Sequence, residues 1–275
     1  MQPIQLPNSS EALVTVSKAH EHVWTIEMHN GADNRLSEPM CRALSTALDI
    51  VEKGWRDVWR VAYNDKNDQE KVKGSGALII IANRKQQKFF SNGFDYPTLQ
   101  RRPHFIPTFF HPIMKQLLGY PIPVIAAING HAFAAGFMLA MCCDYRVMKA
   151  SKAWLSMNEL LFGGPIPHSF SALFNSKAAD STIVRKIFIE AHRFTSAEAL
   201  EVRLVDEVVE GDSDAVFNAS LNRALKLSHL PRMGVYGLIK KEINYTALRG
   251  IVDDPRMVFP IEEEQAFGYK ISAKL

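Results

Sequence analysis

Apolar positions along the chain form short buried runs separated by amphipathic segments. Five runs have the length and the β-branched content of strands: residues 12–16, 23–28, 78–82, 124–128 and 145–148. The clearest helical pattern begins at Ser37, a predicted N-cap, and has Pro39 in its first turn. Its apolar face consists of Met40, Ala43, Leu44, Ala47, Leu48 and Val51. This alternation of strands and helices predicts an α/β core.

Strand patterns give way to helical ones after about residue 180. The predicted later helices cover residues 182–190, 214–227 and 233–242. We therefore expect a core over residues 1–195, followed by a helical C-terminal part and tail over residues 196–275. The polar stretch at 64–76 predicts a surface loop.

Composition excludes several classes of protein. Of the 275 residues, 47% are hydrophobic and 22% are charged, which is typical of a globular protein with a sizeable core. The net charge of +3 gives no support for a nucleic-acid partner. No apolar run is long enough to predict a membrane span, and the first residues lack the pattern of a secretory signal. We expect Cys41, Cys142 and Cys143 to be reduced core residues.

The last three residues carry a possible targeting signal. Ala273, Lys274 and Leu275 are close to the Ser-Lys-Leu address that directs proteins to peroxisomes. The sequence thus predicts a peroxisomal import receptor as a partner and the peroxisome as the location.

The common catalytic motifs are missing from the sequence. It contains no phosphate-binding loop, no dinucleotide-binding glycine motif, no His-Glu-x-x-His and no Gly-x-Ser-x-Gly. No histidine has a second ligand-type residue at metal spacing, so His131 and His168 are interpreted as structural residues or as residues merely near a site, and no metal is assigned.

Two segments predict free backbone amides at the start of a helix. Residues 88–95 follow the expected strand at 78–82, and residues 128–140 run from a buried strand through small residues into an apolar helix. Two such amides directed at one point would form an oxyanion hole. For either segment alone, the preferred interpretation is that Gly93 and Gly136 are turn and packing glycines.

These segments resemble the enoyl-CoA hydratase/isomerase (crotonase) superfamily. The resemblance rests on residues 91–95, 126–136 and 143–146, with further similarity at 33–37, 194–200 and 204–206. The order is maintained over roughly residues 10–245. The resemblance implies a crotonase-type ββα spiral core with a helical C-terminal trimerisation part, and it is closest to the peroxisomal Δ3,Δ2-enoyl-CoA isomerases of fungi and plants.

The resemblance also implies an acyl-CoA substrate, assembly as a homotrimer or hexamer, and no cofactor, since coenzyme A belongs to the substrate. The implied oxyanion-hole donors are the amides of Phe94 and Ala135. Asn34, Arg35 and Leu36 are expected beside the nucleotide end of CoA, and Asp95 as a cap for the next helix. The other expected substrate-binding residues are Ser91, Gly93, Phe133 and Met138.

Hydratases of this family use two glutamates, and the resemblance implies that this chain has one. The position of the first is Met138, whose thioether cannot transfer a proton. The second corresponds to Glu159. A single carboxylate suffices to shift a double bond, so we expect Δ3,Δ2-enoyl-CoA isomerase activity in fatty-acid β-oxidation. We expect Met138, Leu160 and Phe162 to surround Glu159 and raise its pKa.

Several alternatives remain open at this point. The same fold hosts hydratases and dehydratases, some in fungal secondary metabolism, as well as decarboxylases, thioester hydrolases and non-catalytic acyl-CoA-binding proteins. An aromatic group is either an apolar tunnel for the acyl chain or plain core, and it consists of Phe90, Phe94, Phe105, Phe109, Phe110 and Phe133.

Overall fold

The main sheet has seven strands in a computed structural model, which describes residues 2–9, 11–64, 74–85, 88–178, 180–254 and 257–274. The strand order is β1-β2-β3-β4-β6-β8-β11. The first three strands pair antiparallel, and every later neighbour pairs parallel. The strands are β1 (Ile4–Leu6), β2 (Val14–His20), β3 (Val23–Met28), β4 (Ala77–Ala82), β6 (Val124–Ile128), β8 (Tyr145–Lys149) and β11 (Glu207–Val209).

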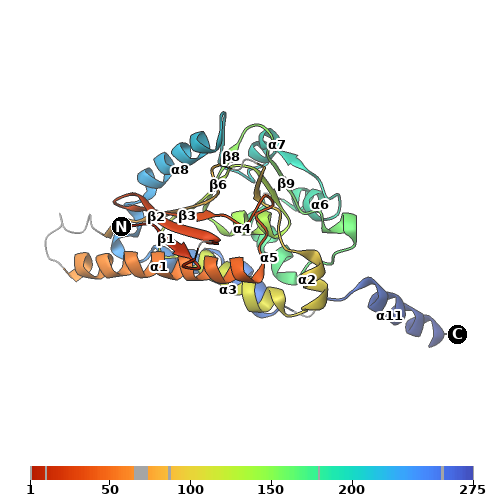
Figure 1. The fold of residues 1–275 in the computed structure, drawn as a ribbon. Coiled ribbons are helices and arrows are strands. Elements are labelled where there is room, and N and C mark those ends of the chain that lie inside the picture. Colours follow the sequence, from red (N-terminus) through yellow and green to blue (C-terminus); the bar gives the residue numbers. More distant parts are fainter. Residues whose placement is uncertain are drawn as a thin grey trace.

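The central strands are apolar throughout because both faces of the sheet are covered. Every residue of β4 and β6 is buried. The long helix α1 (Glu38–Asn64) and α3 (His111–Leu118) contribute to the larger apolar core, on one face of the sheet. On the other face, α8 (Ser213–Leu227) packs against β4, β6 and β8 (Figure 1).

A second, smaller sheet has the order β10-β9-β7-β5. The parallel strands β5 (Phe89–Ser91), β7 (His131–Phe133) and β9 (Trp154–Ser156) lie side by side, and β10 (Phe194–Thr195) pairs antiparallel with β9. Each of these strands has only two or three residues. The second sheet therefore depends on its surroundings for stability.

The remaining helices follow the strands or form the C-terminal part. These helices are α2 (Tyr96–Arg101), the π-helix η2 (Ile106–Phe110), α4 (Ala135–Cys142), the 3-10 helix η3 (Glu159–Phe162), α5 (His168–Lys177), α6 (Ser181–Phe188), α7 (Ser196–Glu201), the 3-10 helix η4 (Leu230–Met233), α9 (Tyr236–Ile243), α10 (Tyr245–Val252) and α11 (Pro260–Ser272). Helix α10 packs closely on α5, and α11 extends away from the body of the molecule (Figure 1).

The five predicted strands and the principal predicted helices are confirmed, with shifts at their ends. The expectation that only helices follow residue 180 is wrong, because β10 and β11 lie there and β11 extends the main sheet beside β8. The division into 1–195 and 196–275 stays a prediction. Both β11 and α8 belong to the second part and pack on strands of the first. Of the predicted loop at 64–76, Asn64 ends α1, and residues 65–73 lie outside the described residues.

Two further expectations concern the core and the membrane. All three cysteines are buried and free of disulfides. Within the described ranges, none of the helices combines the length and the apolar character that crossing a membrane requires.

Close packing of α10 on α5 depends on a residue without a side chain. A Cβ on Gly250 would collide with the Cβ of Ala172, whereas a Cβ on Gly268, in α11, would meet nothing. We expect Gly250→Ala to lower the free energy of unfolding by about 1–3 kcal/mol, because overpacking outweighs the helix propensity of alanine. The matched control, Gly268→Ala, should raise it by at most about 1 kcal/mol. Urea denaturation measures both, and equal effects would contradict the packing argument.

Candidate active site

Three chain segments leave the second sheet on the same side. The strands β5, β7 and β9 run parallel, and their carboxyl ends meet at one edge. Residues 92–95 follow β5, residues 134–135 follow β7, and residues 157–159 follow β9. The carboxyl edge of parallel strands is where such folds bind ligands. The expected donor segments and the expected carboxylate are thus neighbours because of strand register.

The first donor segment contains a position at which only glycine fits. Gly93 has a φ of 72°, and a Cβ there would lie 2.9 Å from the Cβ of Ala134 and 3.1 Å from the amide nitrogen of Ala135. The backbone before Phe94 therefore lies against the start of α4. The hydroxyl of Ser91, which is buried, accepts a hydrogen bond from the Gly93 N–H at 3.2 Å and donates one to the Asn34 carbonyl.

The second donor segment turns sharply between β7 and α4. Ala134 has a φ of 52° and a ψ of −125°, a strained conformation for a residue with a side chain. Its N–H donates to the Ser156 carbonyl of β9, and its carbonyl accepts from the Phe137 and Met138 amides of α4. Gly136 lets α4 approach β5, since a Cβ there would collide with the Ser91 carbonyl.

The two amides expected to form the oxyanion hole have no acceptor within the part of the chain that the structure describes. Phe94 and Ala135 are both buried, and neither N–H takes part in a hydrogen bond between described residues. Buried backbone donors almost always have a partner. Two adjacent free donors, one at a helix N-terminus, can bind an oxyanion or a polarised carbonyl.

Glu159 is the first residue of η3, in the segment that follows β9. It is half-buried, and its Oε2 is shielded from solvent with no hydrogen-bond partner among the described residues. Burial raises the pKa of the Glu159 carboxyl to about 7, with a small opposing effect from a backbone hydrogen bond. A carboxyl with that pKa can take up and release a proton near neutral pH.

The loop that carries Glu159 packs on the helix that follows Phe94. The Tyr96 hydroxyl donates to the Gly163 carbonyl at 3.3 Å, and the Tyr96 and Phe162 rings meet edge to face with centroids 4.9 Å apart. These contacts join η3 to α2 across the carboxyl edge of the second sheet.

The apolar surroundings expected for Glu159 are only partly present. Met138 is fully buried in α4. Leu160 and Phe162 are 57% and 45% exposed, so the expectation that both enclose the carboxyl is wrong. In a 3-10 turn, successive side chains diverge by about 120°, so Leu160 points away from the direction of Glu159. Phe162, three residues after Glu159, lies on the same side of the turn, and its ring packs on Tyr96.

Asn34, Arg35 and Leu36 lie behind the Phe94 segment. Asn34 and Leu36 are fully buried, and the Asn34 side chain donates to the Phe90 carbonyl and accepts from the Asn30 amide. Arg35 donates to the Asn92 and Phe94 carbonyls. Their expected position beside the nucleotide of CoA stays a prediction, and the contacts present are internal.

Asp95 occupies the N-cap position of α2, but its side chain bonds to no backbone amide there. Its carboxylate accepts from the Thr98 hydroxyl at 2.6 Å. Asp95 stands at the start of the helix as expected, but the prediction that its side chain caps the helix is wrong, because the carboxylate accepts from a side chain and not from a backbone amide.

The six phenylalanines do not form one group. The ring of Phe94 contacts those of Phe105 and Phe110, and Phe105 contacts Phe109. The ring of Phe133 lies elsewhere, stacked on His131. Phe133 therefore belongs to a different aromatic group from the ring of Phe94.

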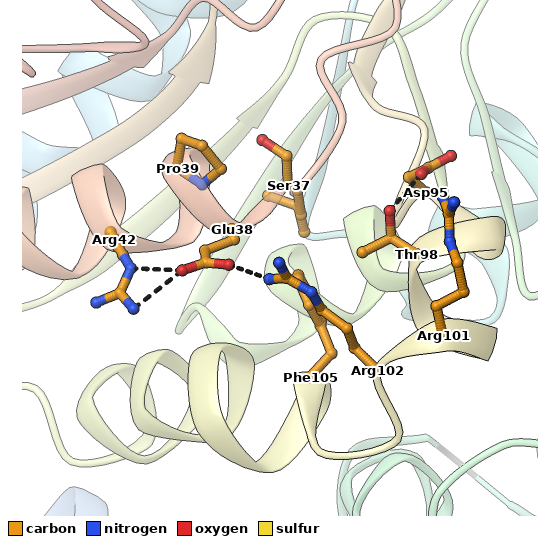
Figure 2. Close-up of a pocket in the computed structure, with 10 residues that line it drawn as sticks. Ser37, Glu38, Pro39, Arg42, Asp95, Thr98, Arg101, Arg102 and Phe105 are labelled. Carbon is orange, nitrogen blue, oxygen red and sulfur yellow. Dashed lines mark hydrogen bonds and ion pairs between the residues drawn. The ribbon is translucent and has the colours of Figure 1, made fainter.

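A pocket of about 750 Å³ opens beside the Phe94 segment, between α1 and α2 (Figure 2). Glu38 bridges Arg42 and Arg102, and Arg101 lies on the same wall as Asp95. The hydrogen bonds from the two arginines lower the pKa of Glu38. The lining residues are Leu36, Ser37, Glu38, Pro39, Arg42, Asp95, Thr98, Arg101, Arg102 and Phe105.

Sequence reasoning missed the arginines of this pocket. Arg42 comes from α1, whereas Arg101 ends α2 and Arg102 follows it, so the three residues are brought together from distant parts of the chain. The adjacent pair Arg101 and Arg102, just after the Phe94 segment, was the available signal. The pocket has three arginines and two carboxylates, and this excess of positive charge makes it suitable for a polyanion.

Comparisons with known proteins identify the family of this chain. The family model described as enoyl-CoA hydratase/isomerase matches residues 62–247. The chain belongs to that family. The enoyl-CoA delta isomerase 2, peroxisomal, of Arabidopsis thaliana is 34% identical over 70% of this chain and 83% of its own length. The enoyl-CoA delta isomerase 3 of the same plant is 32% identical over 68% and 81%.

A solved structure gives the same result for the fold. The crystal structure of an enoyl-CoA hydratase from Mycobacterium marinum superposes with a TM-score of 0.72, covers 88% of this chain and 95% of its own, and is 24% identical. The expected crotonase-type α/β fold with C-terminal helices is confirmed. Among the described residues, no cluster of histidine, cysteine, aspartate and glutamate could hold a metal ion.

The raised pKa of Glu159 predicts a pH-dependent cost in stability. The folded state binds a proton to this carboxyl more tightly than the unfolded state does, so this group's contribution is fully present below about pH 4.5. This contribution to the free energy of unfolding amounts to at most about 3 kcal/mol, and it is lost as the pH rises to about 7. Glu159→Gln should therefore gain stability relative to wild type between pH 4.5 and 7.5. Guanidinium denaturation at several pH values measures this difference, and a constant difference would contradict the burial of the carboxyl.

Proposed function

We propose that the protein is a Δ3,Δ2-enoyl-CoA isomerase that acts in fatty-acid β-oxidation. The observation that carries the proposal is one half-buried carboxyl, Glu159, whose Oε2 has no partner among the described residues. It lies at the edge of the second sheet, where two amides without an acceptor in the described chain also lie. At the α4 position where a second carboxylate would serve hydration, the chain has the buried Met138.

In the proposed reaction the Glu159 carboxylate removes a proton from C2 of a 3-enoyl-CoA. The electrons of the broken C–H bond move into the thioester, and the resulting dienolate carries its negative charge on the thioester oxygen. The amides of Phe94 and Ala135 donate hydrogen bonds to that oxygen. The protonated Glu159 then delivers the same proton to C4, which leaves the double bond between C2 and C3.

A single group can serve in both steps only if it binds and releases protons easily. A pKa of about 7 makes Glu159 a much stronger base than a solvated glutamate and still a usable acid. The desolvation that raises the pKa thus supports the proposed proton transfer.

The arginine-lined pocket between α1 and α2 supports coenzyme A as the carrier of the acyl group. Arg42, Arg101 and Arg102 can donate to phosphate oxygens. The pocket also borders Asp95, directly after Phe94, so a chain leaving it would reach the donor amides. In this proposal coenzyme A is part of the substrate, and no further cofactor takes part.

The proposal is tested by turnover of a 3-enoyl-CoA and of the matching 2-enoyl-CoA in water. The wild type should isomerise the former and hydrate the latter little. Glu159→Gln should lower the isomerisation kcat by about 10²–10⁴-fold, because it removes the proton carrier. Glu201→Gln, at an exposed position of α7, is the matched control and should retain full activity.

Three other outcomes would contradict the proposal. Hydration by the wild type would mean that another acid group acts in place of the residue missing at position 138. Full activity of Glu159→Gln would exclude this carboxyl. No turnover of either substrate would favour a different acyl-CoA reaction or a binding protein.

We also infer assembly as a homotrimer or hexamer. The C-terminal helices expose apolar side chains that a subunit contact would cover, among them Leu238, Ile239 and Ile243 of α9 at 61%, 58% and 75%. Helix α11 leaves Ile261 and Phe267 mostly exposed as well. Exposed apolar residues of this extent are typical of an interface.

Import into peroxisomes is proposed from the last three residues and from the peroxisomal relative in Arabidopsis thaliana. The final residue lies outside the described part of the structure. A fluorescent reporter that ends in residues 266–275 should collect in peroxisomes, because the import receptor recognises the terminal tripeptide. The same reporter without the last three residues should stay in the cytosol. A cytosolic location of the intact fusion, or a mitochondrial location of the full chain, would contradict the proposal.

A further inference from the structure

Four peptide carbonyls around the Phe94 donor, those of Phe90, Asn92, Gly93 and Phe94, accept hydrogen bonds from residues 34–36. The Asn34 side chain donates to the Phe90 carbonyl at 2.7 Å, and the Leu36 N–H donates to the Gly93 carbonyl at 2.9 Å. Arg35 donates to the carbonyls of Asn92 and Phe94 at 3.0 and 2.7 Å. Residues 34–36 therefore form a brace along the back of the donor segment.

The brace fixes the direction of one particular N–H. The carbonyl of Gly93 and the N–H of Phe94 belong to the same planar trans peptide, so they point in opposite directions. The bond from the Leu36 N–H to that carbonyl directs the Phe94 N–H away from the brace. The start of α4 lies against the same peptide, because a Cβ on Gly93 would lie 3.1 Å from the Ala135 nitrogen.

Arg35 holds the peptides on either side of the donor peptide. Its Nη1 carries two hydrogens and donates to two acceptors, the carbonyls of Asn92 and Phe94. Its Nη2 pairs with the Asp33 carboxylate at 3.3 Å, and that carboxylate also accepts from the Asn92 side chain. The rotation of the Gly93–Phe94 peptide is thus restricted from both neighbours.

We propose that Arg35 is a positioning residue, which orients the Phe94 amide in the oxyanion hole and does not bind coenzyme A. This rests on the proposed function, in which the Phe94 amide is a donor. Arg35 is absent from the lining of the arginine pocket, where Arg42, Arg101 and Arg102 provide the positive charge. Both hydrogens of its Nη1 are used on the Asn92 and Phe94 carbonyls, and its Nη2 pairs with Asp33.

The kinetic test compares Arg35→Met and Arg35→Lys with Arg60→Met, a surface control in α1 whose side chain pairs with Asp57. With a 3-enoyl-CoA, Arg35→Met should lower kcat about 10–100-fold and change KM less than about threefold, since a misdirected donor costs less than a deleted one. Arg35→Lys should recover part of kcat, because an ammonium group can reach one carbonyl. Arg60→Met should match the wild type.

Two kinetic results would overturn the proposal. An unchanged kcat in Arg35→Met would show that the amide needs no such support. A large, salt-dependent rise in KM with kcat unchanged would make Arg35 a ligand of the CoA phosphates instead. The melting temperature of each variant separates these effects from loss of fold.

A second measurement does not depend on turnover, so it also separates this proposal from the proposed function. With ¹⁵N-phenylalanine labelling, the Phe94 amide resonance should shift or broaden in Arg35→Met and stay in place in Arg60→Met. An unchanged Phe94 resonance would overturn the positioning role even if the wild type proved inactive on 3-enoyl-CoA. A moved resonance in an inactive wild type would refute only the proposed reaction.

Discussion

The site depends on the parallel register of three very short strands. Beside β5 and β7, neighbouring backbones approach so closely that a side chain would not fit at Gly130 or Gly136. A Cβ on Gly136 would collide with β5, and a Cβ on Gly130 would lie 2.7 Å from the Lys88 carbonyl. These strands are too short to be stable alone, and the large sheet and its helices hold them in place. The large sheet and its helices therefore also hold two amides and one carboxyl at a common edge.

The buried position of the Glu159 carboxyl lowers the stability of the folded protein. A buried oxygen and a pKa of about 7 both reflect loss of hydration, for which no ion pair among the described residues compensates. Ala134 adds a strained backbone at the start of α4. Unfavourable local features of this kind persist where the surrounding structure imposes them, and their gathering at one edge is typical of an active site.

The sequence predicts the parts of this protein that have a long period or a family motif. The apolar runs of β3 and β6 and the amphipathic face of α1 repeat over enough residues to be recognised. The strands β5, β7 and β9 have three residues each, which no periodicity can reveal. Exposure of Leu160 and Phe162 and the meeting of Arg42 with Arg102 depend on tertiary packing, so the sequence alone did not predict them.

One continuous segment connects the Phe94 donor amide with the arginine pocket. Residues 34–36 brace the Phe94 peptide, and Ser37, Glu38 and Arg42 directly follow on to line the arginine pocket. Helix α2 makes the same connection from the other side, since it begins after Phe94 and ends at Arg101. A polyanion bound to these arginines would therefore contact both elements beside the donor amide, which are the segment leading into α1 and helix α2. Under the proposed function, the binding energy of a remote, unreactive part of the substrate can in this way be used to fix the geometry at the reacting thioester.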